Sequence, residues 1–219
     1  MSKSAGLESE KAVPVVFVVD DDESIRQGLD SLLRSVGFRV ELFGSAADFL
    51  QSPAVDAPSC LVLDIRLPGL GGLALQTQMA EWEHRMPIVI ITGHGDVPMS
   101  VRALKAGAVD FLTKPFRDQD ILDAVSQAIE LDRQRRREKH ALDDILALYR
   151  KLTDREREIF YLVTQGFMNK QIAGKLGLSE ITIKLRRGQV MRKMAARSFA
   201  DLVKKAEQLK PFVAKGGSG

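Results

Sequence analysis

The chain has 219 residues, of which 45% are hydrophobic and 28% charged, a balance typical of a folded protein of one or two domains. The single cysteine, Cys60, excludes a disulfide framework and a cysteine-based zinc site, so we expect a protein of the reducing cytoplasm. The N-terminus "MSKSAGLESEK" lacks a signal-peptide core, and no apolar run approaches the roughly 20 residues that cross a bilayer.

The formal net charge of +3 hides two halves of opposite sign. Residues 14–131 contain 9 Lys and Arg against 17 Asp and Glu, which gives a net charge of −8. Residues 132–219 contain 21 against 10, which gives +11. This asymmetry predicts two domains with different partners, and it makes the basic one a candidate for binding nucleic acid.

Short apolar runs alternate with segments of helical periodicity through the acidic half. The strands that we expect are 15–19, 39–43, 60–63, 88–91 and 109–112. The helices that we expect between and after them are 24–35, 46–51, 74–82, 98–106 and 118–130. Five repeats of strand then helix predict an α/β domain, a doubly wound parallel sheet of five strands covered by helices on both faces.

Polar residues follow four of these strands. Asp20 and Asp21 come after the first strand, Asp64 after the third, Thr92 after the fourth and Lys114 after the fifth. The carboxyl ends of parallel strands share one edge of a sheet, so these side chains should gather in one crevice. Three crowded carboxylates repel one another unless a cation joins them, and their oxygens suit Mg²⁺. Thr92 and Lys114 could then neutralise a phosphoryl group that is transferred onto a carboxylate.

Each of these residues also has an ordinary structural explanation. The acidic run 20–23 could be only the start of a helix, which the helix dipole favours, and we expect that role for Asp22 and Glu23. A polar residue after one strand is usually a turn or cap residue, and only the coincidence at four strand ends favours a site. The residues alone do not choose between Asp20 and Asp64 as the phosphate acceptor.

The motifs "VVDDDE", "LVLDIRLPGLGG", "IVIITGHGDVP" and "VDFLTKPF" occur in this order in residues 14–131, which therefore resemble the receiver domain of bacterial two-component response regulators. The resemblance implies a flavodoxin-like fold and phosphorylation of Asp64 by a sensor histidine kinase. It also implies that Mg²⁺ is held by three carboxylates and a main-chain carbonyl, those of Asp20, Asp21, Asp64 and Arg66.

The same resemblance assigns further roles. It implies that Thr92 and Lys114 contact the phosphoryl group, that Phe111 acts with Thr92 as a conformational switch, and that the Lys114–Pro115 bond is cis. The glycines of "RLPGLGG" predict a tight turn that brings the backbone close to the metal, with a flexible loop as the alternative.

The segment "DRQRRREKHALDDILALYRKL" predicts a helical linker over 132–150. Apolar residues recur in it at helical spacing, which could serve core packing or pairing with a second copy, and we expect core packing. They are Leu142, Ile145, Leu146 and Tyr149. The cluster from Arg133 to Arg137 could contact phosphate, although we favour a solvated linker face.

Three helix signals follow the linker. Thr153 and Glu156 form a capping box that begins one helix, and we expect Asn169 to cap a second helix that is closed by Gly177. Ser179 begins a third helix. Two short helices joined by a turn that contains glycine predict a helix-turn-helix motif.

The third helix has two contrasting faces. Its inward positions are spaced by seven and four: Ile183, Val190 and Met194. Two cations and a missing side chain are expected on the other face: Lys184, Arg187 and Gly188. Such a face can enter a major groove, with its charges on phosphates or guanine edges and its backbone close to the DNA. A basic helix that is only solvated is the alternative.

Residues 150–210 resemble the LuxR-type DNA-binding domain through "LTDREREI", "GFMNKQIA" and "LSEITIKLRRGQVMRKM". They depart from its pattern at Arg186, where family members commonly carry histidine. The residues that we expect to contact DNA are Asn169, Lys170, Thr182, Lys184, Leu185, Arg187, Gly188 and Arg192.

Joined, the two halves resemble response regulators of the FixJ and NarL type. The expected parts are a disordered N-terminus at 1–13, a receiver at 14–131, a helical linker at 132–150, an all-α four-helix helix-turn-helix domain at 151–210 and a flexible tail at 211–219. The resemblance implies a transcription factor and not an enzyme. Phosphorylation would make two copies pair, so that their DNA-binding domains read paired half-sites of promoter DNA. RNA polymerase would be a further partner.

Two other functions fit parts of the chain. One is a DNA-binding regulator with a vestigial receiver, whose operator affinity would not depend on phosphorylation. The other is a phosphohydrolase that uses an aspartyl-phosphate intermediate. Such enzymes usually need a second acid two residues after the nucleophile, and Arg66 occupies that place.

Overall fold

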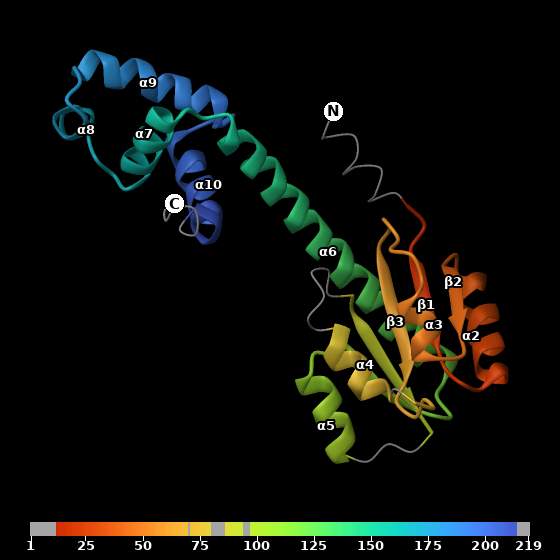
Figure 1. Ribbon diagram of the computed structural model, residues 1–219. Helices are drawn as coiled ribbons and strands as arrows, with labels where there is room; N and C mark the ends of the chain where they lie inside the picture. The colour runs from red at the N-terminus through yellow and green to blue at the C-terminus, as the bar shows by residue number, and fades with distance from the viewer. Residues whose placement is uncertain (1–11, 70, 80–85, 94–96, 214–219) are drawn as a thin grey trace. The chain divides into compact units, whose positions relative to one another are not determined.

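The computed structural model describes residues 12–69, 71–79, 86–93 and 97–213, so most of the expected disordered N-terminus and of the expected tail lies outside the described residues. The chain forms two compact units, one that ends at Arg137 and one that begins at Glu138 (Figure 1). Of the helices in the described ranges, none combines the length and apolar character that crossing a membrane requires.

The first unit is built on a parallel sheet of five strands in the spatial order β2-β1-β3-β4-β5. The strands are β1 Val15–Val19, β2 Arg39–Phe43, β3 Ser59–Asp64, β4 Ile88–Thr92 and β5 Asp110–Thr113. Every residue of β1, β3 and β4 is buried, because helices cover both faces of the sheet, and these strands therefore read as continuous apolar runs. The predicted fold class is confirmed.

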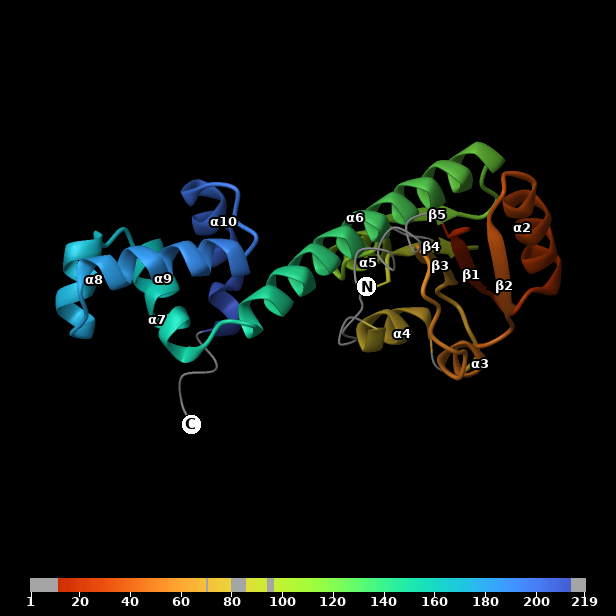
Figure 2. The ribbon, with the colours of Figure 1, turned by 90° about the horizontal axis from the view of Figure 1, so that it is seen from above.

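Helices cover the sheet on both sides. The helices of this unit are α2 Glu23–Ser35, α3 Ala46–Leu50, α4 Gly72–Met79, α5 Val97–Lys105 and the first part of α6 Asp118–Arg150. Leu33 of α2 and Ile121 of α6 belong to the core on one face, whereas Phe49 of α3 and Leu75 of α4 belong to the core on the other. Figure 2 shows α6 along one face and α3 and α4 along the other. The last three residues of the helix expected at 74–82 lie outside the described residues.

Helix α6 is continuous from Asp118 to Arg150 and combines the expected last receiver helix with the expected linker. The domain boundary at 131/132 stays a prediction, since the helix runs through it without a break. Ile145, Leu146 and Tyr149 pack in the core of the second unit, which confirms the expected core packing for these three residues.

The second unit consists of helices around one core. After the end of α6 come α7 Asp154–Thr164, α8 Asn169–Leu176, α9 Glu180–Lys193 and α10 Phe199–Val213. Its fully buried centre includes Ile159, Ile172, Ile183 and Leu202, one residue from each of these four helices. The Thr153–Glu156 capping box is present, and Gly177 ends α8 with a φ of +64°.

The expected cap at Asn169 is wrong. Met168 precedes α8, and its backbone N–H donates to Oε1 of Gln171 at 2.8 Å. Asn169 is the first residue of the helix, and its Oδ1 accepts a hydrogen bond from Arg187 at 3.2 Å. The free N–H at this helix start is therefore satisfied by the glutamine, which leaves the asparagine side chain for a contact with α9.

Candidate functional sites

Three carboxylates gather at the carboxyl edge of the sheet. The carboxylates of Asp20, Asp21 and Asp64 each place an oxygen within 4.8 Å of the others. β1 and β3 are hydrogen-bonded neighbours, so the residues that end or follow them meet at this edge. Asp20 and Asp64 are buried, at 0% and 5% exposure, whereas Asp21 is exposed and leaves the group open to solvent. The predicted convergence of the strand ends is therefore present.

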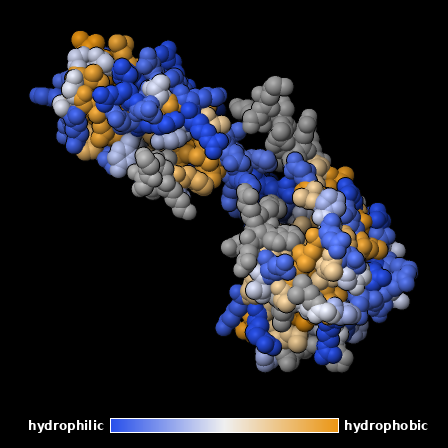
Figure 3. All heavy atoms as spheres, viewed as in Figure 1, coloured by the Kyte–Doolittle hydropathy of each residue, from blue (hydrophilic) through white to orange (hydrophobic). Residues whose placement is uncertain are grey.

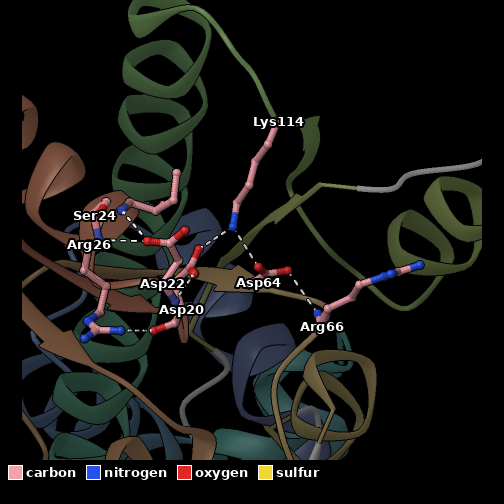
Figure 4. A network of polar contacts seen from close by, with 8 residues as sticks. Asp20, Asp22, Ser24, Arg26, Asp64, Arg66 and Lys114 are labelled. Atoms are coloured by element: carbon pink, nitrogen blue, oxygen red, sulfur yellow. Dashed lines mark hydrogen bonds and ion pairs between the residues drawn. The ribbon is translucent and has the colours of Figure 1, made fainter.

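Lys114 links two of these acids. Its Nζ donates to Oδ2 of Asp20 at 2.6 Å and to Oδ2 of Asp64 at 2.7 Å (Figure 4). Burial by itself would lower the pKa of Lys114, but the hydrogen bonds and charges of both acids outweigh it and raise this pKa. Burial raises the pKa of Asp20, and the hydrogen bonds from Lys114 and from the Asp22 N–H offset this only in part. The edge of the sheet is thus a place where positive charge is strongly favoured.

The loop after β3 holds Asp64 from its backbone. The N–H of Arg66 donates to Oδ1 of Asp64 at 3.0 Å, and the N–H of Gly72 donates to the carbonyl of Ile65 at 3.0 Å. Gly69 has a φ of +78°, which glycine adopts without strain. In the part of "RLPGLGG" that the structure describes, the chain turns back onto the strand end, as the tight-turn prediction requires.

Helices α8 and α9, joined by the turn at Gly177, form the helix-turn-helix of the second unit. Ile183, Val190 and Met194 are buried at 0%, 1% and 0% exposure, which confirms the predicted inward face of α9. On the outside, several of the expected DNA contacts are exposed: Lys170, Lys184, Leu185, Gly188 and Arg192.

Comparison with known proteins bears on both sites. Residues 16–126 match the model of the response regulator receiver domain, and residues 150–206 match that of the bacterial regulatory proteins of the luxR family. The chain belongs to the two-component response regulators.

Relatives match the response regulator over nearly its whole length. It is 55% identical to nodulation protein W of Bradyrhizobium diazoefficiens, over 89% of the chain and 86% of that protein. It is 40% identical to the transcriptional regulatory protein FixJ of the same species, over 87% of the chain and 93% of that protein. The solved structure of the response regulator StyR is 49% identical and has a TM-score of 0.80, with 90% of the chain and all of StyR covered. The protein is therefore a transcription regulator with a receiver and a LuxR-type DNA-binding domain.

Thr92 and Phe111, the two residues expected to act as a switch, lie on the neighbouring strands β4 and β5 of the response regulator. Thr92 ends β4 and is fully buried. Ile91, the residue before Thr92, pairs in register with Asp64 of β3. Phe111 on β5 is partly buried and packs against the core beneath α3, α4 and α5. The bond between Lys114 and Pro115 is cis, as the resemblance implied.

Arg26 is a site residue that the sequence did not point to. Its Nη1 donates to the backbone carbonyl of Asp20 at 2.6 Å and so holds the strand end from the first turns of α2 (Figure 4). A cation near the start of a helix opposes the helix dipole, and this unfavourable position was the available signal. Asp22 has the expected capping role, since its Oδ1 accepts from the N–H groups of Ser24 and Ile25.

The predicted orientation of Arg187 is wrong. Its Nη1 donates to Asn169, and its guanidinium lies 5.1 Å from the centre of the Phe199 ring, so the side chain joins α9 to α8 and α10. At about 100° per residue, position 187 is only about 40° around the helix from the buried Ile183. The residue does not share the outward face with Lys184, and its contact with DNA stays a prediction.

The arginine cluster of α6 is not uniformly solvated, contrary to expectation. The Arg136 side chain is only 12% exposed, and its guanidinium donates to Asp132 at 2.9 Å and to Asp56 at 3.0 Å. Asp132 is fully buried and also accepts from the backbone N–H of Ser59 at 2.9 Å. Asp132 and Arg136 are four residues apart on one helix face, which lets them meet and fasten α6 to the start of β3.

Proposed function

We propose that this response regulator receives a phosphoryl group on Asp64 from a sensor histidine kinase, and that the phosphorylated form pairs and binds promoter DNA. The observation that carries the proposal is the position of Lys114 Nζ, within 2.7 Å of both Asp20 and Asp64. An ammonium held between a buried carboxylate and the candidate acceptor supports charge neutralisation at the point where a phosphoryl group would arrive.

The donor set fits a divalent cation. Three carboxylates and one ammonium gather at this edge of the sheet, so within this group of described side chains acidic groups outnumber basic ones. Mg²⁺ prefers hard oxygen ligands, and we assign it to Asp20, Asp21, Asp64 and the main-chain carbonyl of Arg66. When bound, the ion would supply the charge that offsets the phosphoryl oxygens.

Three side chains of the protein have separate roles in the phosphoryl transfer. An oxygen of Asp64 forms the new bond to phosphorus while the P–N bond of the kinase phosphohistidine breaks, and the electron pair returns to the imidazole. Lys114 turns from the acids to the phosphoryl oxygens, and the hydroxyl of Thr92 donates to the same group. When Thr92 moves inward, it leaves space beside the sheet. The side chain of Phe111 then moves into that space.

The output is proposed to be pairing of two copies through α5, β5 and α6. Val101 and Leu104 of α5 are 42% and 46% exposed, which supplies apolar surface for such a contact. A tenfold change in the ratio of inactive to active forms needs only about 1.4 kcal/mol of differential interaction. Two joined copies would then read paired half-sites, with RNA polymerase as a later partner.

The proposed DNA contacts lie on α8 and α9. They are Asn169, Lys170, Thr182, Lys184, Leu185, Arg187, Gly188 and Arg192. The exposure of most of their side chains and the excess of positive charge in this half of the chain support the assignment.

The test compares phosphorylation of the unmodified protein with that of Asp64→Asn. The control is Asp30→Asn, the same change at an acid of α2. A radiolabelled small acyl phosphate with Mg²⁺ should label the unmodified protein and Asp30→Asn but leave Asp64→Asn unlabelled. Analytical ultracentrifugation should show pairing only in the two proteins that are labelled. Equal sedimentation of all three proteins, or operator affinity that is the same with and without the acyl phosphate, would contradict the proposal and favour a vestigial receiver.

A further inference from the structure

Two large aliphatic side chains stand exposed on the helix proposed to enter DNA. Ile181 is 74% exposed and Leu185 is 66% exposed, whereas Ile183 between them is fully buried. Exposed aliphatic side chains on an otherwise polar helix face do not stabilise the fold, because they remain in water. Their presence side by side indicates a surface that is covered when the protein works.

The two side chains belong to one outward stripe of α9. Positions 181 and 185 each lie roughly 160° around the helix from Ile183, on either side, and about 40° from one another. Gly188 and Arg192 continue the same side of the helix, and we call Ile181, Leu185, Gly188 and Arg192 the outward stripe. Figure 3 shows hydrophobic atoms among hydrophilic ones at the edge of the second unit where Figure 1 places α9.

We infer that Ile181 and Leu185 recognise the C5-methyl groups of thymines, an inference that rests on the proposed DNA binding by α9. Exposed cations accompany the apolar pair on the two helices of the motif, namely Lys184 and Arg192 on α9 and Lys170 on α8. A partner that suits this arrangement carries negative charge at its rims and apolar groups on its floor. The major groove has this character, with phosphates along both edges and thymine methyls among the base edges.

The helix surface next to Ile181 and Leu185 is open. A methyl group added at Gly188, next to Leu185 on the outward stripe, would have no heavy atom within 4 Å. The protein therefore leaves the space beside Leu185 open, so that a base edge can come close to the helix. The groove of a thymine-bearing half-site is the occupant that fits both the apolar pair and this opening.

The test begins with the full-length protein and a duplex that it selects from a random pool. Each thymine of the selected half-site is replaced in turn by uracil, which removes only the C5-methyl group. We expect binding to weaken about fourfold at each of two neighbouring positions, from the loss of one buried methyl at each. This part needs no protein variant, so no folding defect can obscure it.

Ile181→Ala and Leu185→Ala then show which side chain covers which methyl. In each variant the uracil penalty should disappear at one position and persist at the other. Val36→Ala, a change of a 51% exposed aliphatic residue on the receiver, should keep both penalties.

Two negative results have different meanings. If the protein selects a specific duplex but no uracil changes its affinity, or if the two alanine variants keep every penalty, the methyl inference is overturned while the proposed function stands. In that case Ile181 and Leu185 would instead be covered by a protein partner. If no sequence is selected by the phosphorylated protein, DNA recognition by α9 and this inference fail together.

Discussion

A Cβ atom on Gly72 would lie 2.3 Å from the carbonyl oxygen of Asp64. The first residue of α4 is thus pressed against the strand end that carries the proposed phosphorylation site, and the main chain there cannot yield as a flexible side chain would. We expect Gly72→Ala to lower the free energy of unfolding of the receiver by about 1–3 kcal/mol, the cost of overpacking a filled site. Labelling of Asp64 by acyl phosphate should slow in the same variant. Urea denaturation and the rate of labelling measure the two effects.

Gly28→Ala is the matched control for this steric effect. Gly28 lies inside α2, and a methyl group there would meet no heavy atom within 4 Å. The variant should be more stable by roughly 0.5–1 kcal/mol, because alanine favours the helix. If both variants gain stability, the close approach of Gly72 to Asp64 does not constrain the site.

Arg136→Met should destabilise the first unit strongly. The change removes the Arg136 cation from the fully buried carboxylate of Asp132, and breaking a buried pair on one side costs about 3–5 kcal/mol. Arg137→Met removes an exposed cation that pairs with Glu130 and should cost no more than about 1 kcal/mol. Chemical unfolding of the two variants side by side measures the difference. Equal small losses would mean that Arg136 does not fasten α6 to β3.

Glu156 makes the second unit sensitive to acid. Burial alone would raise the pKa of this carboxyl, but the hydrogen bonds from Lys193, at 2.6 Å, and from Thr153 outweigh it and lower the pKa. The folded chain therefore takes up this proton less readily than the unfolded chain. The stability contributed by Glu156 is present above its ordinary pKa of 4.5 and is lost as the pH falls through the lower pKa of the folded state.

Glu156→Gln should flatten the pH dependence of unfolding in that window and lower stability at neutral pH. Glu158→Gln changes an exposed carboxyl that pairs with Arg155, and it should leave the profile close to that of the unmodified protein. Thermal unfolding followed from pH 7 downward compares the three proteins. Parallel profiles for all of them would show that the contacts of Glu156 carry no net stabilisation.

The strand-end residues could be predicted from the sequence because their position along the chain determines which edge of the sheet they reach. Asp64 and Lys114 meet for this reason, although 50 residues separate them. The side-chain partners of helical residues were harder to predict. The sequence predicts that Asp132 and Arg136 lie on one helix face, because they are four residues apart. The contact of Asp132 with Ser59, 73 residues away, depends instead on how α6 packs against the sheet. At Arg187 the position on the helix outweighs the residue type, because about 40° from the buried Ile183 its side chain turns toward α8 and α10.

A change at Gly188 should shift stability and DNA affinity in opposite directions. It lies inside α9, where glycine is about 1 kcal/mol less favourable than alanine, and a methyl group there would meet no heavy atom within 4 Å. Nothing in the packing of the free protein therefore accounts for a glycine at this position. Gly188→Ala should raise the free energy of unfolding by roughly 0.5–1 kcal/mol. It should also weaken binding to the selected duplex, because the methyl group would occupy the space through which the base edge approaches.

Gly174→Ala supplies the comparison, since Gly174 is an exposed glycine inside α8 with the same open surroundings. It should gain a similar stability without any loss of affinity. Urea unfolding and fluorescence anisotropy with a labelled duplex give both quantities for both variants. A Gly188→Ala protein that is stabilised and still binds with unchanged affinity would show that DNA does not approach α9 at this residue, and the outward stripe would then have to contact the groove closer to Ile181.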